Sequence, residues 1–496
     1  MIRNRDYIMD KLIKMKKISI LFLMLAISAA INVFSQTVSL DNTFGDNGNT
    51  RIPNTSSIDF FDFDSHGSIV AVGITLLDDS KCYLTIAKTS ANGIVDESFG
   101  ENGLVKITDY HTSYPVGLKI TNDNKIIVVG SFTKVQFEGI KTIMMRFNED
   151  GSLDENFGDK GMVNLNFNNQ FAFSNADDFM LIAYWDSQGY NIVKYNDEGE
   201  IDRSFGENGV VSFTNVIYPY CMKILSDNSI IVAGTYNNSG ETELGVCKLT
   251  PNGGELDTNF ADGGIWHMNT MKDFDLSYEY FSNILEDNNG NIILSGSGLV
   301  NSQGWSSRAF LSKFSPDGML DTDFGENGFY CFDFLGNDNP VFHIENKYIT
   351  AGWYNNEVHK IIYVDDDGGS GDYVYTSDIY YFQAMKLQGD NKIILGGGYK
   401  IDDLYRANFA LQRIVVDLPS SNDINNYSSK ELAVFPNPVK EILYFSNDAT
   451  FEIIDIQGKV ILKSITPVNS INVRNLKNGF YFIRLDNSVV RKFIKK

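Results

Sequence analysis

The side chains that could do chemistry are scattered along this chain and form no known catalytic motif. Its five histidines make no HExxH pair and lie near no cysteine pair, so the zinc signatures are missing. The sequence also contains no GxSxG elbow and no glycine-rich phosphate loop. Among 63 acidic residues a glycosidase-like carboxylate pair stays open, but no spacing selects one. We therefore expect binding more than catalysis.

Aromatic residues recur two positions after the small residue that ends a repeated apolar run, which is glycine in each case except Ala183 before Trp185. They are Phe132, Trp185, Tyr236, Tyr354 and Tyr399, with Trp353 beside Tyr354. Aromatic rings with polar edges stack well on sugars and peptides. We predict that these rings form a ligand-binding face, with packing between repeat units as the alternative use of the same rings.

The densest acidic cluster is Asp365-Asp366-Asp367-Gly368. Asp365, Asp367 and Asp372 are weak candidates for a calcium site. Their spacing fits no Asp-x-Asp-x-Asp loop with a distal acid. We therefore expect no metal and no other cofactor.

One short motif repeats along the chain: Gly, any residue, an aliphatic, Asp, two residues, Phe-Gly, two residues, Gly. It runs from Gly93 to Gly103 and recurs at 151–161, 199–209 and 318–328. A further copy at 254–264 has Ala261 in place of the second glycine, and a copy at 40–48 lacks the first part of the motif. Glycine permits positive φ in tight turns, and aspartate accepts backbone N–H groups. We therefore predict a structural motif whose phenylalanine anchors the loop between repeat units.

Three strand patterns accompany each motif. The first is an apolar run that ends near a glycine, as in Lys125–Ser131. In the second, a basic residue alternates with apolar ones, as in Ile143–Phe147. The third follows the motif, as in Leu104–Ile107. Together with a first strand, each unit of about 50 residues holds four strands, as in a propeller blade. We predict an all-β fold: a seven-bladed β-propeller over residues 36–417, in which a strand near Asn49–Pro53 completes the last blade and closes the ring.

The negative charge of the chain limits the classes of partner that it can bind. The net charge is −22, and residues 36–429 carry 24 basic against 55 acidic side chains. Nucleic acid and anionic membranes require a basic face, so neither is an expected partner.

The four cysteines lie in separate apolar strands with no CxxC spacing. We expect buried free thiols.

The two ends differ from the middle. The pattern of residues 1–35 predicts a signal peptide, because lysines precede the apolar run Ile18–Ile31. We expect cleavage between Ser35 and Gln36. Met15 is a second candidate for the first residue of the protein. No other stretch is long enough to span a membrane. Residues 418–429 form a polar linker. Residues 430–496 carry eleven basic and six acidic side chains and alternate like a small β-sandwich.

Two family resemblances rest on these motifs. Residues 40 to about 417 resemble the delta-60 repeat, a β-propeller repeat of bacterial secreted and surface proteins, through Asp96, Phe99, Gly100, Gly103 and their counterparts. The C-terminal 65 residues or so resemble the type A sorting domain of the type IX secretion system of Bacteroidetes. The matching residues there are Phe435, Pro436, Asn437, Pro438, Gly458, Gly479, Tyr481, Lys495 and Lys496.

The sorting resemblance implies export, recognition by the type IX secretion machinery, and removal of the terminal domain at the linker. We therefore expect a monomeric extracellular or outer-membrane surface protein that binds a glycan or protein ligand. The alternatives are an extracellular polysaccharide hydrolase or lyase with a central site, and a structural surface component. A deep cavity with converging acids favours the enzyme, a shallow aromatic face favours binding, and a structural protein needs no cavity.

Overall fold

The computed structural model describes the following parts of the chain: residues 37–77, 81–134, 139–167, 170–176, 178–187, 189–213, 217–238, 241–251, 254–269, 276–300, 306–332, 340–344, 346–355, 358–365, 370–375, 379–389, 391–400, 407–417, 434–435, 439–454, 459–485 and 489–495. These residues form strands and turns without a helix, which confirms the all-β prediction. None of them therefore belongs to a helix able to cross a membrane. The predicted signal peptide, its Ser35–Gln36 cleavage site and the linker lie outside the described residues.

Contacts divide the chain into two compact units, Thr37–Asp417 and a second unit that contains residues 434–495. In the first unit, four sheets each contain four consecutive antiparallel strands. They are β11 (Gln170–Asn175), β12 (Phe179–Asp186), β13 (Gly189–Asn196) and β14 (Val210–Phe213); β15 (Ile217–Ile224), β16 (Ile230–Asn238), β17 (Glu241–Leu249) and β18 (Ile265–Met268); β19 (Leu276–Glu286), β20 (Ile292–Val300), β21 (Ser306–Phe314) and β22 (Phe329–Cys331); and β23 (Val341–Ile344), β24 (Lys347–Asn355), β25 (Val358–Asp365) and β26 (Ser370–Tyr375).

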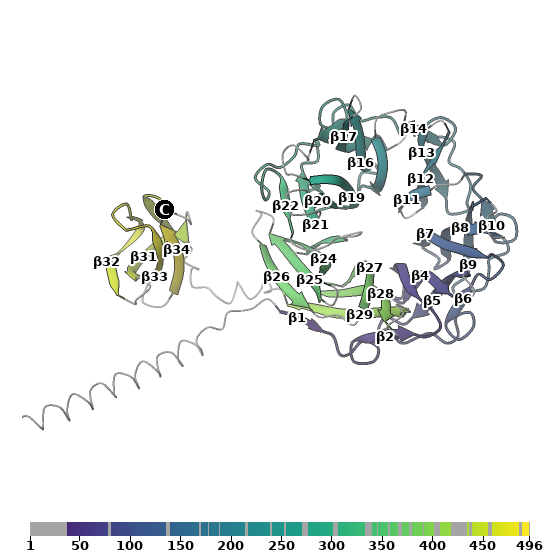
Figure 1. Ribbon diagram of the computed structural model, residues 1–496, viewed down its shortest axis with the longest axis horizontal. Coiled ribbons are helices and arrows are strands. Elements are labelled where there is room, and N and C mark those ends of the chain that lie inside the picture. Colours follow the sequence, from purple (N-terminus) through teal and green to yellow (C-terminus); the bar gives the residue numbers. More distant parts are fainter. Residues whose placement is uncertain are drawn as a thin grey trace, which may run out of the picture. The chain divides into compact units, whose positions relative to one another are not determined.

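A larger sheet contains two further runs of four strands, joined by one parallel pair between β5 and β7. These strands are β3 (Ser57–Phe63), β4 (Ile69–Leu76), β5 (Cys82–Thr89) and β6 (Leu104–Lys106), then β7 (Thr112–Ile120), β8 (Ile126–Thr133), β9 (Lys141–Phe147) and β10 (Met162–Asn164). Figure 1 shows the sheets of this unit side by side around a common centre.

The last sheet joins the two ends of the unit. It contains β27 (Ile379–Gln388), β28 (Lys392–Lys400) and β29 (Ala407–Asp417). Two N-terminal strands, β1 (Thr37–Leu40) and β2 (Asn49–Ile52), pair with successive parts of β29. The N-terminal segment therefore supplies the outer edge of the sheet formed by the last three strands of the unit.

The recurring motif links neighbouring sheets. Its phenylalanines are at most 1% exposed: Phe44, Phe99, Phe157, Phe205, Phe260 and Phe324. A Cβ placed on Gly93 would lie 2.6 Å from Phe44 Cζ, so this ring packs against the glycine that begins the next motif. The Gly100 N–H also donates to the carbonyl of Asp150, the residue directly before the next motif, at 2.8 Å. The predicted anchoring role of the motif phenylalanine is confirmed.

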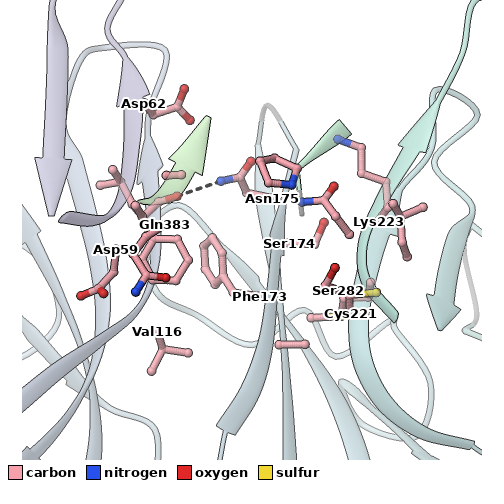
Figure 2. Close-up of a pocket in the computed structure, with 18 of the residues that line it drawn as sticks. Asp59, Asp62, Val116, Phe173, Ser174, Asn175, Cys221, Lys223, Ser282 and Gln383 are labelled. Carbon is pink, nitrogen blue, oxygen red and sulfur yellow. Dashed lines mark hydrogen bonds between the residues drawn. The ribbon is translucent and has the colours of Figure 1, made fainter. Parts of the chain in front are cut away.

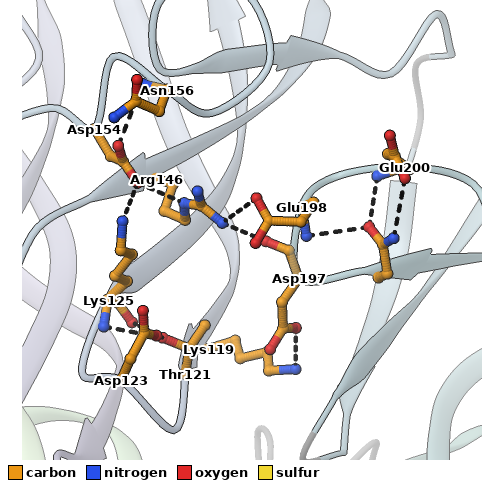
Figure 3. A network of polar contacts seen from close by, with 11 residues as sticks. Lys119, Thr121, Asp123, Lys125, Arg146, Asp154, Asn156, Asp197, Glu198 and Glu200 are labelled. Carbon is orange, nitrogen blue, oxygen red and sulfur yellow. Dashed lines mark hydrogen bonds and ion pairs between the residues drawn. The ribbon is translucent and has the colours of Figure 1, made fainter.

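The motif aspartate pairs with the basic residue of the preceding strand. Arg146 Nε lies 2.8 Å from Asp154 Oδ2, and Lys194 Nζ lies 3.0 Å from Asp202 Oδ2. Arg146 Nη1 also donates to the Asp197 carbonyl at 2.9 Å, in the first turn of the following motif. Figure 3 shows this network crossing from one sheet to the next. The alternating basic residue therefore helps to hold adjacent sheets together.

The cysteines follow the prediction with one exception. Three cysteines are buried and form no disulfide, as expected: Cys82, Cys221 and Cys247. Burial raises the pKa of Cys82 to about 11 and that of Cys247 to about 12. Cys331 is free but exposed, so the prediction of a buried thiol is wrong there. It is the last residue of β22, which is an edge strand of its sheet.

The second unit forms a sheet in the order β30-β31-β33-β34, with β32 on the other side of β31. These strands are β30 (Val434–Phe435), β31 (Ile442–Ile454), β32 (Val460–Asn472), β33 (Gly479–Leu485) and β34 (Val489–Lys495). Its core contains Val439, Leu443, Phe451, Ile453, Ile471, Val473 and Ile483. Among the described residues these strands belong to one hydrogen-bonded sheet.

Candidate functional site

The strands that open each run of four, here called the opening strands, are β3, β7, β11, β15, β19, β23 and β27. Six of them contain a β-bulge. The register shifts fall between Ile58 and Phe60, Pro115 and Gly117, Gln170 and Ala172, Pro219 and Cys221, Phe281 and Asn283, and Phe382 and Ala384. A bulge leaves one residue outside the ladder and can redirect its side chain.

Glycines in the neighbouring strands make these bulges sterically acceptable. A Cβ on Gly234 would lie 1.9 Å from the Tyr218 carbonyl oxygen, and one on Gly73 would lie 2.0 Å from that of Ser57. Only a residue without a side chain allows the two backbones to approach so closely. The prediction that this glycine ends its strand is wrong, because β16 continues from Gly234 to Asn238.

The opening strands surround a cavity of about 560 Å³. Five residues skipped at the bulges line it: Asp59, Val116, Tyr220, Ser282 and Gln383. Figure 2 shows side chains from several opening strands directed into this space. The volume lies in the range typical of small-molecule sites. The cavity is therefore our candidate functional site.

The cavity wall is largely polar. Asn175 Nδ2 donates to the Leu118 carbonyl at 3.0 Å, which holds its amide at the wall (Figure 2). Ser174 Oγ accepts the Ile224 N–H at 3.3 Å. Gln383 and Asn283 add further amides, and Phe60, Phe173 and Tyr220 supply aromatic surface. Such a wall can hydrogen-bond the hydroxyl groups of a ligand and also stack against its apolar faces.

Four charged side chains, two acidic and two basic, also line the cavity: Asp59, Asp62, Lys223 and Lys386. Lys386 Nζ lies 2.8 Å from Asp62 Oδ1, so these two form an ion pair across neighbouring opening strands. Lys223 extends into the cavity in Figure 2. Burial lowers the pKa of Lys223, and the positive charge of Lys386 adds to this effect, while Glu286 and Asp62 oppose it.

The predicted aromatic residues lie on different sheets, and the structure gives them different surroundings. Phe132 is 1% exposed and its ring lies 4.7 Å from that of Tyr110, so it belongs to the core. Packing, the alternative considered for these rings, is therefore the role of Phe132. Trp353 and Tyr354 lie in β24, and their side chains are outside the described part of the chain.

Three other rings of this set reach the surface. Trp185 is 46% exposed and borders a second cavity of about 600 Å³, beside the stacked rings of Phe167 and Tyr184. Tyr236 stacks on His267 at 4.4 Å. Tyr399 lies 3.9 Å below the Arg51 guanidinium. Among the described rings of the set, no two contact each other, so they form separate sites.

Of the weak calcium candidates, only Asp365 has a described side chain. Asp365 forms an ion pair with Lys347, Asp367 lies outside the described residues, and Asp372 pairs with Ile362 through the backbone of β26. A short connection between β25 and β26 takes the place of the motif here. A different group, Asp64, His66 and Glu149, has suitable spacing for a cation. Lys88 Nζ already lies 3.1 Å from Asp64 and 3.2 Å from Glu149, so a lysine ammonium fills this role.

The predicted sorting residues fall in the second unit. Phe435 lies in β30, and Gly479 and Tyr481 lie in β33, where the Tyr481 hydroxyl donates to the Lys477 carbonyl at 2.9 Å. Lys495 ends β34 and is buried. Pro436, Asn437, Pro438, Gly458 and Lys496 lie outside the described residues.

The cavity residues were not predicted from the sequence. A signal for three of them was present, because Asp62, Lys223 and Lys386 occupy the same register position in their opening strands, as does Lys119 outside the cavity wall. A charged residue at a fixed place in an otherwise apolar repeat could have indicated an inner ring. The bulges gave no such signal, since a single skipped residue looks like ordinary strand in the sequence.

Comparisons with known proteins agree with the two resemblances. Residues 433–496 match the secretion system C-terminal sorting domain. Residues 121–157, 225–260 and 288–324 match a β-propeller domain of unknown function. No curated protein matches the sequence.

Several solved structures resemble the chain at low identity. A polysaccharide lyase, Uly1, has 12% identity and a TM-score of 0.46 over 76% of this chain and 92% of its own. A protein of unknown function from Dyadobacter fermentans has 11% identity and a TM-score of 0.42, covering 77% and 99%. PorZ, a surface component of the type IX secretion system of Porphyromonas gingivalis, has 11% identity and a TM-score of 0.34, covering 91% and 60%. At these values no activity can be transferred.

The sorting-domain match identifies the export route, which leads through type IX secretion to the cell surface or the extracellular space. The propeller match covers three of the motif-containing segments described above. The chain therefore combines β-propeller repeats of this family with a C-terminal sorting domain of the type IX secretion system.

Proposed function

We propose that this exported protein is a saccharide-binding β-propeller whose ligand enters the central cavity. In this proposal the first unit has seven four-stranded blades, the last completed by β2, and the second unit folds as a small sandwich around its core. The observation that carries the functional proposal is the cavity wall. It combines amides and hydroxyls from several blades with aromatic surface, in a volume suited to a few sugar rings.

The test uses the full mature chain on a glycan array, followed by calorimetry with each hit. Gln383→Ala should weaken binding, because this amide lines the cavity. Asn289→Ala, an exposed amide on the turn before β20, is the matched control and should bind like the wild type. Absence of saccharide binding by the wild type, or equal affinity in both variants and the wild type, would contradict the proposal.

The rival proposal is a polysaccharide hydrolase or lyase acting in the same cavity. Asp59 and Asp62 support it, since both acids line the space. Asp62 is held by Lys386, which favours a positioning role for this carboxylate. Incubation of array hits with the protein, with detection of new reducing ends or unsaturated products, separates catalysis from binding. A purely structural surface component would need no such cavity.

We propose a second binding surface formed by residues of the aromatic set. Trp185 supports this most directly, because it combines exposure with an adjacent cavity. Tyr236, Tyr399, Trp353 and Tyr354 remain further candidates. Phe132 is left out because its ring is buried.

A further inference from the structure

Three opening strands carry a lysine at the same register position. Lys119 pairs with Ile127, Lys223 with Ile231 and Lys386 with Ile394 through the backbone. In the repeating architecture these three side chains are equivalent. Their ionic surroundings can therefore be compared directly.

Two of the three lysines have an acidic partner. Lys119 forms an ion pair with Asp197 and donates to the Phe179 carbonyl at 3.3 Å. Lys386 pairs with Asp62 at 2.8 Å. Among the described residues, the Lys223 side chain forms no hydrogen bond and no ion pair, although it lines the cavity and is exposed to solvent there.

The two acids that act electrostatically on Lys223, Asp62 and Glu286, already have other partners. Asp62 is paired with Lys386. Glu286 accepts the Ser226 N–H at 2.7 Å and the Ser226 hydroxyl at 2.8 Å. The Lys223 side chain is exposed to solvent within the cavity, and its positive charge has no acidic partner of its own there. The surrounding protein also lowers the pKa of Lys223. An anionic ligand in the cavity could supply the missing partner.

We infer that Lys223 binds the anionic group, carboxylate or sulfate, of an acidic saccharide in the central cavity. This inference rests on the proposed saccharide-binding function and adds the charge of the ligand. Figure 2 shows Asn175 on the neighbouring wall, toward which the Lys223 side chain extends. Its amide and the Ser174 hydroxyl can then bind sugar hydroxyls beside the anionic group. Lysine serves well here because its ammonium is a compact point charge with three donors.

The experiment compares three sets of oligosaccharides of matched length with the full mature chain: uronate-containing, sulfated and neutral. The wild type should bind one of the anionic sets more tightly than the neutral set, and the preferred set identifies the anionic group. Lys223→Met should reduce that affinity about 10-fold or more and leave neutral binding unchanged. Lys223→Arg should restore part of the loss, and thermal unfolding checks that each variant folds.

Lys141→Met is the matched control, because it removes an exposed lysine of β9 that does not line the cavity. It should behave like the wild type. If anionic and neutral saccharides bind equally, or if Lys223→Met keeps the anionic preference, this inference is wrong while the proposed function stands. If the wild type binds no saccharide of any set, the proposed function is wrong and the inference fails with it.

Discussion

Asp41 and Arg413 lie 372 positions apart in the sequence and form a buried ion pair, with Arg413 Nε 2.9 Å from Asp41 Oδ2. Arg413 also donates to the Ala91 carbonyl at 3.1 Å and to the Thr43 hydroxyl at 3.0 Å, and it covers the Phe44 ring. One guanidinium therefore links the N-terminal motif, the last sheet and the turn of the next motif. Arg146 makes the equivalent contacts to Asp154 and Asp197 inside the continuous chain.

Loss of the Arg413 side chain should destabilise the fold and weaken the pairing of the N-terminal strands with the last sheet. Removal of one partner from a buried ion pair costs about 3–5 kcal/mol, because the other charge is left unpaired. Arg413→Met should lower the free energy of unfolding by this amount and raise hydrogen exchange in residues 37–52. Arg146→Met, the matched control, should lose similar stability without faster exchange in that segment. Unchanged exchange there in Arg413→Met would contradict the role assigned to this pair.

Acid should destabilise the protein through the same pair. Burial alone raises the pKa of Asp41, but hydrogen bonds from Thr43 and the charges of Lys392 and Arg413 outweigh it and lower the pKa below its usual range. A lowered carboxyl pKa stabilises the fold above the unfolded value, about 3.9, and this contribution is lost as the pH falls toward the folded value. Denaturant unfolding from pH 7 to pH 2.5 should show this decline. Asp41→Asn should show a shallower one, and parallel curves would speak against the assignment.

Gly234 should tolerate no side chain. A Cβ there would lie 1.9 Å from the Tyr218 carbonyl, so Gly234→Ala must displace the bulged strand β15. We expect a loss of about 1–3 kcal/mol, the usual cost of overpacking. Gly139→Ala is the control, since its Cβ would meet nothing within 4 Å. Chemical denaturation of both variants gives the comparison, and equal stability would show that the close approach relaxes at no cost.

Substitutions in the aromatic set should have different effects on stability and binding, because the rings differ in burial. Phe132→Ala should cost about 3–5 kcal/mol, because it empties a buried site. Trp185→Ala should keep the fold and reduce ligand binding, if the exposed ring belongs to a binding surface. Thermal unfolding and the glycan array measure the two effects. Full ligand binding by Trp185→Ala would remove this residue from the proposed surface.

The C-terminal unit should control export. Deletion of residues 433–496 removes the matched sorting domain and should retain the protein inside the cell envelope. Cell fractionation with immunodetection measures this, and the full chain is the control. Mass spectrometry of the surface form should show an N-terminus at Gln36 and a C-terminus upstream of residue 433. A surface form that still ends at Lys496 would contradict cleavage.

Local interactions explain why much of the architecture could be predicted from the sequence. The Asp96–Gly103 turn depends on positive φ at Gly100 and Gly103 and on the Asp96 carboxylate accepting the Ser98 N–H. These contacts lie within a few residues, so their pattern is visible in the chain itself. The β-propeller repeats, the inter-sheet role of the motif phenylalanine and the sorting domain followed from such patterns.

The candidate site required the tertiary structure. The cavity forms only where opening strands far apart in the sequence meet, and each bulge shifts which side chain faces it. The acidic partners of Lys119 and Lys386 also come from other sheets, so the missing partner of Lys223 could not be read from the sequence. The same holds for burial: Phe132 and Trp185 occupy equivalent sequence positions, but packing buries one ring and exposes the other. The repeats, their turns and the route of export could be predicted because they depend on local patterns, whereas particular side chains meet at the centre only through long-range packing.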